Sequence, residues 1–295
     1  MAFTPATPMT ASPTFQLTPG QDTPGAVLGM LERRVTFGTI VALVGLAVGA
    51  WALTVQQALG MADMVTGLGQ VGSRMPNPMT APVFLLMWLT MMVAMMFPTI
   101  APMVLAHRLV VQHRGEGTFS SVAFVVGYIV VWTVIGLVPL AIFLAFRDLT
   151  EDQPVTAWLP RTSGLVLISV GLYQFTPWKR ACLRACRTPL SFIMTHDFGS
   201  RAPGAFRAGL SHGAYCLGCC WGLMTVLVVV GLMNLVWMAA LALVFLAEKN
   251  WQHGVTFNRV VGTAVAVLGC AVVLYPEFLG VVSGAPSVAP SISGM

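Results

Sequence analysis

Long apolar runs, separated by short polar segments, dominate the pattern along the chain. Seven of these runs have the roughly 17 to 25 residues that a helix needs to cross a membrane. They lie at residues 36–58, 82–106, 119–146, 158–176, 208–231, 233–249 and 258–281. The pattern predicts an all-α fold, a polytopic transmembrane helix bundle with seven spans.

The division between the fifth and sixth runs depends on two residues. Residues 223–245 are almost entirely apolar, and Gly231 and Asn234 supply the turn chemistry within them. We expect a break there and two spans. One long buried helix, which would reduce the total to six spans, is the alternative.

Composition agrees with a membrane protein, because charged residues make up 8% of the chain and apolar residues 57%. A soluble domain, in which about a quarter of residues are charged, could not cover its surface with this composition. We expect a Pro/Thr-rich tail at 1–30, a transmembrane domain at 31–282 and a second tail at 283–295. The net charge of +5 on such a chain indicates lipid contact and orientation, and nucleic acid is not expected as a partner.

Basic residues gather on alternate connections between the spans. They precede the first span, follow the second and fill the connection at 177–207, whereas the connection at 147–153 is acidic. The positive-inside rule then places the amino terminus in the cytoplasm. Thiols in the connection at 177–207 lie on the same side, where disulfides are not maintained.

Three cysteines in the fifth span are the strongest candidates for chemistry. Cys216, Cys219 and Cys220 are three and four residues apart, a spacing that places side chains on one helical face, and His212 lies one turn before Cys216. Thiolates and imidazoles at such spacing can share a metal ion. A single cysteine would more often be a packing residue, but three in five positions beside a histidine favour a metal or redox site.

The second span contains the motif MMVAMM at 91–96, in which methionines recur at intervals of four. Met91 and Met95 form one row on the helix, and Met92 and Met96 form the next. Thioethers are soft, neutral ligands that favour Cu(I), although methionine is also a common filler of apolar helices.

Pro98 and Pro102 follow the methionine motif within the same predicted span. Proline has no amide hydrogen and clashes with the preceding turn, so we expect these residues to break or kink the helix. The carbonyl groups that they release would have to lie against protein or a cavity, because lipid cannot satisfy them.

Cys182 and Cys186 lie four residues apart in the basic segment KRACLRACR. They could pass a metal to the membrane cluster, act as a redox couple or carry palmitate, or the segment could be only a basic amphipathic helix at the membrane surface. Cationic neighbours are expected to lower the pKa of both thiols. At the end of the sixth span we expect Lys249 to pair with Glu248.

Several familiar active sites are absent from the sequence. It contains no phosphate-binding loop, dinucleotide-binding fingerprint, zinc-protease motif or haem-attachment motif. The sequence therefore assigns no reaction to the chain.

The motifs MMxxMMxP and CxxCCW, here Met91 to Pro98 and Cys216 to Trp221, resemble a bacterial family of predicted metal-binding integral membrane proteins. The resemblance covers roughly residues 80–250. It implies a metal ion at the cysteine and methionine positions and, with the predicted orientation, a multi-pass protein of the bacterial inner membrane.

The sequence favours a protein that binds a soft transition metal, Cu(I) before zinc, in metal transport or in delivery to a copper enzyme. The expected ligands are Cys216, Cys219, Cys220, His212, Met91, Met92, Met95, Met96, Cys182 and Cys186. One alternative is an accessory or assembly subunit of a larger membrane enzyme, with structural cysteines. Another is a membrane thiol oxidoreductase that cycles Cys216 with Cys219 or Cys220.

Overall fold

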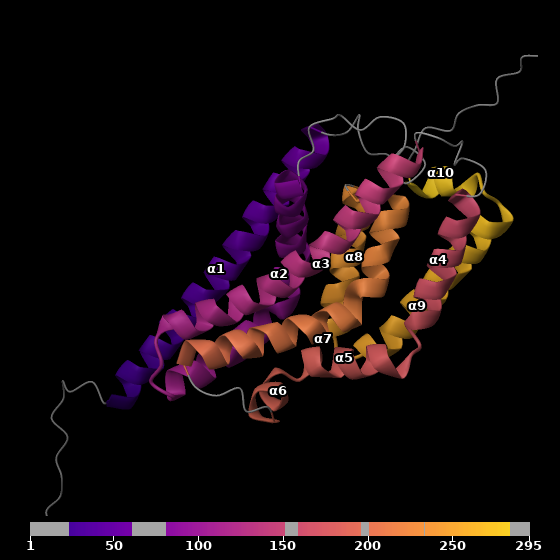
Figure 1. Ribbon diagram of the computed structural model, residues 1–295. Coiled ribbons are helices and arrows are strands. Elements are labelled where there is room, and N and C mark those ends of the chain that lie inside the picture. Colours follow the sequence, from indigo (N-terminus) through magenta and orange to yellow (C-terminus); the bar gives the residue numbers. More distant parts are fainter. Residues whose placement is uncertain (1–23, 61–80, 151–158, 196–200, 233, 284–295) are drawn as a thin grey trace, which may run out of the picture. The chain divides into compact units, whose positions relative to one another are not determined.

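The computed structural model describes residues 24–60, 81–150, 159–195, 201–232 and 234–283, and these residues contain helices and no strand. Figure 1 shows the helices in chain order. They are α1 (Pro24–Gly60), α2 (Ala81–His113), α3 (Thr118–Thr150), α4 (Leu159–Tyr173), α5 (Pro177–Arg187), α6 (Pro189–Thr195), α7 (Arg201–Val230), α8 (Leu235–Asn250), α9 (Gly254–Leu274) and α10 (Phe278–Ser283). The all-α expectation is confirmed.

The chain divides into two compact units, residues 1–38 and residues 39–295, and all sites below belong to the second. Residues 1–23 and 284–295, which make up most of the two expected tails, lie outside the described residues. Helix α1 begins at Pro24.

Five helices of the described part are long and apolar enough to cross a membrane. They comprise Thr36–Leu59, Ala81–His113, Thr118–Ile142, Arg201–Val230 and Gly254–Leu274. Helices α4 and α8, where two further spans were expected, have 15 and 16 residues. That is shorter than the roughly 20 residues of an untilted span. The chain therefore has the helices of a multi-pass membrane protein.

The expected break between the fifth and sixth apolar runs is confirmed. Helix α7 ends at Val230, and Gly231 follows with φ 112°, a conformation that residues other than glycine rarely adopt. Asn234 then caps α8, where its Oδ1 accepts a hydrogen bond from the Trp237 amide at 3.3 Å. One long helix in this region is excluded.

Helix α2 continues through Pro98 and Pro102 to His113, so these prolines do not break it. In the same stretch the Thr99 hydroxyl donates to the Met96 carbonyl at 2.8 Å. Much of this stretch is also buried against other helices, which supply the packing that lipid alone would not.

Two pairs of helices pack closely, α3 with α7 and α4 with α9 (Figure 1). Close approach of α3 and α7 depends on Gly209, because a β-carbon there would strike the backbone carbonyl of Phe124. Helix α4 also packs on α7, which joins the two pairs, and α5 packs on α7 and α8. This arrangement positions the cysteines.

Candidate metal centre

Helix α7 holds three thiols on its buried face. The Sγ atoms of Cys216, Cys219 and Cys220 lie within 4.8 Å of one another. Each of these side chains is at most 1% exposed. The thiols of Cys219 and Cys220 donate to the Cys216 carbonyl at 3.1 and 2.7 Å, which orients their sulfur atoms along the same face. The sequence spacing therefore predicted this grouping correctly.

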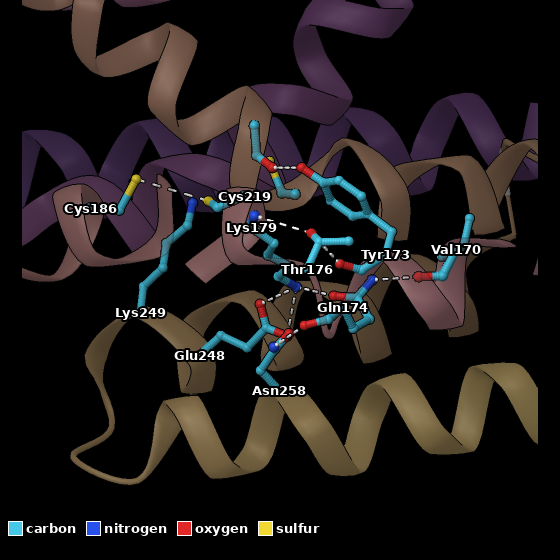
Figure 2. Close-up of polar contacts among 12 residues, drawn as sticks. Val170, Tyr173, Gln174, Thr176, Lys179, Cys186, Cys219, Glu248, Lys249 and Asn258 are labelled. Carbon is cyan, nitrogen blue, oxygen red and sulfur yellow. Dashed lines mark hydrogen bonds and ion pairs between the residues drawn. The ribbon is translucent and has the colours of Figure 1, made fainter. Parts of the chain in front are cut away.

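Helix α5 brings two more thiols to this cluster. It begins after Thr176, whose hydroxyl accepts from the Lys179 amide at 3.3 Å, and Pro177 occupies its first turn. The Sγ of Cys186 lies 3.9 Å from the Sγ of Cys219, a contact drawn in Figure 2. A β-carbon at Gly218 would come within 2.6 Å of the Cys182 Sγ, so glycine is what lets this thiol lie against α7.

The expected lowering of the α5 thiol pKa values is wrong. Burial raises the pKa of Cys182, and a nearby charge on Cys219 adds to this. Hydrogen bonding with Cys216 and Cys219, followed by burial, raises the pKa of Cys186. The basic side chains of Arg180 and Arg184 are exposed, whereas the two thiols face α7. The arginine side chains and the thiols, although close in sequence, therefore lie on different faces of α5.

Met96 of α2 shares a neighbour, Lys249, with the thiol cluster. Its Sδ lies 3.8 Å from the Nζ of Lys249, and that same Nζ lies 3.1 Å from the Sγ of Cys216. Met91, Met92 and Met95 are at most 2% exposed and belong to the hydrophobic core. The methionine motif therefore supplies one side chain to the surroundings of the thiols and three to the core packing.

Lys249 does not pair with Glu248 as expected. Its ammonium group donates to the Cys216 Sγ and, at 3.2 Å, to the Thr99 hydroxyl. Successive residues on a helix point about 100° apart, so Glu248 and Lys249 face different neighbours. Figure 2 shows the Lys249 side chain extending toward the sulfur atoms and away from the Glu248 carboxylate. A cation at this distance stabilises negative charge on sulfur.

Glu248 instead forms a buried ion pair with Lys179 of α5. The Lys179 Nζ lies 3.1 and 3.0 Å from the two carboxylate oxygens, and it also donates to the Gln174 side-chain oxygen (Figure 2). Both ionic side chains are at most 1% exposed. The Asn258 Nδ2 donates to the Gln174 carbonyl at 2.8 Å, and Arg187 donates to the Glu248 carbonyl. This network joins α4, α5, α8 and α9 beside the thiols.

Sequence reasoning missed Lys179, Gln174 and Asn258. Lys179 was counted among the basic residues of a cytoplasmic connection, although it is fully buried. A signal was present, since Gln174 and Asn258 are isolated amides at the ends of apolar runs. Polar side chains in a membrane segment usually have polar partners.

His212 is not in the group formed by the three α7 thiols. Its imidazole lies among the rings of Phe124, Tyr128 and Phe192, with ring centroids 6.0, 5.9 and 5.7 Å away. Tyr128 links this aromatic surrounding to the cluster, because its hydroxyl lies 3.2 Å from the Cys216 Sγ. Sequence spacing placed His212 on the correct face but could not reveal these rings.

The donor set fits a soft cation. Thiolates and a thioether select Cu(I) over hard cations, and four thiolates would also satisfy zinc. All six cysteines of the chain are free, so the thiols of the cluster can exchange protons for a metal.

Comparison with known families supports a copper-related role. Residues 85–272, more than half of the chain, match the family model described as PpoB2, copper chaperone. Searches of curated proteins and of solved structures gave no match. The matched segment contains the cysteine cluster, the methionine motif and both buried lysines.

Proposed function

This chain belongs to the PpoB2 copper chaperone family, and we propose that it binds Cu(I) in its buried thiol cluster and delivers the ion to a copper enzyme. The core ligands in this proposal are Cys216, Cys219 and Cys220. The observation that carries it is the approach of their sulfur atoms to within 4.8 Å of one another.

The thiols of α5 serve as exchange partners in the proposed delivery. The Sγ of Cys186 is 3.9 Å from that of Cys219, a separation that a Cu(I) ion can bridge with modest side-chain movement. An ion shared between two helices can pass from one sulfur to the next without becoming free. A delivery protein needs such a release step, because a site that only holds its ion tightly cannot deliver it.

The proposed setting is the bacterial inner membrane, with the amino terminus and the connection at 177–207 in the cytoplasm. Five helices with the length and hydropathy of spans support the membrane location. The free cysteines fit the reducing side. The proposed partners are membrane lipid, other membrane subunits and the copper enzyme that accepts the ion.

Metal analysis of the purified protein tests this proposal. The wild type and Cys216→Ser/Cys219→Ser/Cys220→Ser are purified in detergent, loaded anaerobically with Cu(I), desalted and measured by elemental mass spectrometry. We expect near-stoichiometric copper in the wild type and its loss in the triple variant. Cys270→Ser is the matched control, because Cys270 is exposed and lies outside the cluster.

Two results would contradict the proposal. Equal copper in the wild type and the triple variant would remove the thiols from the site. No copper in either protein, together with a stable stoichiometric complex with a membrane enzyme, would instead support the accessory-subunit alternative.

A further inference from the structure

Two buried histidines have ring nitrogens without hydrogen-bond partners among the described residues. Both nitrogens of His212 are in this state, and so is the Nδ1 of His107 on α2. The side chains are 1% and 6% exposed, respectively. Such groups are rare, because an unsatisfied buried polar atom is destabilising, and an ion bound at the site is one recognised explanation.

Aromatic rings surround and connect the two imidazoles. His107 stacks on Phe124 with ring centroids 4.5 Å apart, and Phe124 also stacks near His212. The ring of Tyr128 lies on His212 as well, and its hydroxyl contacts the Cys216 Sγ. Faces of aromatic rings attract cations, so a monovalent ion ligated by an imidazole would be stabilised here.

His107 also lines a small pocket at the ends of α2 and α7. The pocket has a volume of about 40 Å³ and includes Arg114, Glu116 and Arg201 in its lining. This volume exceeds the roughly 10 to 15 Å³ that a single water needs. The charged lining makes it a polar opening beside a largely apolar helix interface.

Imidazole and thioether groups, both of which can bind copper, follow one face of α2 and one face of α7 between this pocket and the thiols. On α2, Met103 lies one turn before His107, is 1% exposed, and precedes the pocket in the direction of Met96. On α7, His212 lies one turn before Cys216. Residues three, four and seven apart share a helical face, so these donors lie on one face of each helix, with two turns between Met96 and Met103.

The two rows of donors run in opposite directions between the same two levels, and the Phe124 ring of α3 contacts a histidine of each row. At one level, His107 of α2 and Ala208 of α7 line the same pocket. At the other level, Met96 of α2 and Cys216 of α7 both contact the ammonium group of Lys249. The donors of α2 and α7 therefore begin together at the pocket and end together at the cluster.

We propose that His107, Met103 and His212 form a passage that carries Cu(I) between the pocket at the ends of α2 and α7 and the thiol cluster. The passage rests on the proposed copper function and adds binding positions outside the thiols. Its donors are neutral, so each holds the ion more weakly than a thiolate and can release it to the next. No redox step occurs, since copper stays in its monovalent state.

The kinetics of copper exchange distinguish a passage from a structural role. Full-length protein in detergent is loaded anaerobically from the Cu(I) complex of bicinchoninate, and loss of the complex absorbance is followed by stopped flow. Release to excess bicinchoninate is measured in the same way. We expect His107→Leu and His212→Leu to slow both loading and release by about 10- to 100-fold, the loss typical when a metal site loses a supporting group.

The equilibrium affinity for Cu(I) distinguishes a passage from a binding site at the two histidines. A passage works in both directions, so its loss slows loading and release equally and leaves the equilibrium affinity unchanged. His113→Leu is the matched control, because His113 lies on the same helix and is exposed. Unchanged rates in both variants, or a lower affinity with unchanged loading, would overturn the proposal. His107→Gln and His212→Gln, which keep a polar side chain, replace any leucine variant that does not fold.

A second measurement separates this proposal from the copper function itself. The variant Cys216→Ser/Cys219→Ser/Cys220→Ser is loaded with Cu(I) and its copper ligands are determined by X-ray absorption. We expect a weakly held ion with nitrogen and thioether ligands, which disappears when His212→Leu is added. No nitrogen-bound copper in the triple variant would overturn the passage, even if the wild type holds copper on its thiols.

Discussion

Lys179 and Lys249 are both buried, yet they have different kinds of partner. Lys179 contacts the two oxygens of the Glu248 carboxylate, whereas Lys249 contacts the sulfur of Cys216 and, more distantly, that of Met96. The Lys179 pair is buried on both sides and involves no metal-ligating atom of the cluster, so it is a structural contact. A thiol can be neutral, charged or bound to a metal, so the surroundings of Lys249 can change during function.

Two neighbouring positions of α8 also have different roles. Glu248 and Lys249 are adjacent on α8, but one fixes α5 in place and the other reaches the thiols. The position of Cys182 and Cys186 therefore depends on the ion pair that holds α5. Structural support and the proposed copper site therefore depend on different single residues, which makes them separable by mutation.

Glu248→Gln should have the largest effect on stability. It leaves the Lys179 ammonium group buried without a negative partner, and breaking a buried pair in this way costs about 3 to 5 kcal/mol. Denaturant unfolding of the detergent-solubilised protein measures the change in the free energy of unfolding.

Glu277→Gln is the matched control, since Glu277 is exposed. The double variant Lys179→Met/Glu248→Gln should recover much of the loss, because no unpaired charge remains. A change of less than about 1 kcal/mol for Glu248→Gln would show that the pair does not hold α5, since isolated surface pairs contribute no more than this.

Lys249→Met should affect copper more than stability. The sulfur atoms that lose the ammonium group can remain protonated, so no charge is left unpaired in the apoprotein. A copper thiolate carries negative charge and loses its compensating cation, and we expect its affinity to fall by about 10- to 100-fold. Competition with a Cu(I) chelator measures this affinity.

Arg180→Met provides the control for Lys249→Met, because Arg180 is an exposed cation on α5. If Lys249→Met lowered the free energy of unfolding as much as Glu248→Gln does, the distinction between the two lysines would be wrong.

Asn258→Leu should have a smaller effect. It removes the hydrogen bond from Nδ2 to the Gln174 carbonyl, and one such bond contributes about 0.5 to 1.5 kcal/mol. Copper affinity should stay unchanged, because Asn258 belongs to the network of Lys179. Denaturant unfolding and chelator competition measure both quantities, with Thr263→Val on the same helix as the control. A change in copper affinity would show that the Lys179 network also influences the thiol cluster.

The smallest effect concerns the pH dependence of alkylation on α5. The raised pKa values of Cys182 and Cys186 reduce the thiolate fraction at neutral pH. Iodoacetamide should therefore label both residues slowly at pH 7, and labelling should accelerate as pH rises beyond the ordinary range of a cysteine. Peptide mass spectrometry follows each site, with glutathione as the reference thiol. Rates that level off below pH 8 would mean that the thiols are already ionised.

The sequence contained the local features of this structure but not the long-range ones. Apolar runs located the main helices, and the spacing of Cys216, Cys219 and Cys220 placed their thiols together, because both depend on helical periodicity alone. The pairing of Lys179 with Glu248 spans 69 residues and depends on how α5 packs against α8. Likewise, His212 has neighbours from α3 and α6 that no pattern within α7 could identify.

The rules for proline and for charge were incomplete for a related reason. Pro98 and Pro102 were expected to break or kink the helix and to lie against protein; α2 is not broken, and the stretch around them is buried as expected. Arg180 and Arg184 were expected to act on the thiols of Cys182 and Cys186, but they are exposed, and Arg187 contacts α8 instead. In both cases tertiary surroundings outweighed a rule derived from adjacent residues.

The 69 residues between Lys179 and Glu248 also impose an order on biosynthesis. A ribosome adds about 5 to 20 residues per second, so α5 waits roughly 3 to 14 s for the carboxylate that fixes it. During this interval the thiols of Cys182 and Cys186 are already made, while α8 and its two functional side chains are not. The nascent chain therefore acquires the α5 thiols before the carboxylate that holds them in place, and complete assembly must await synthesis of α8.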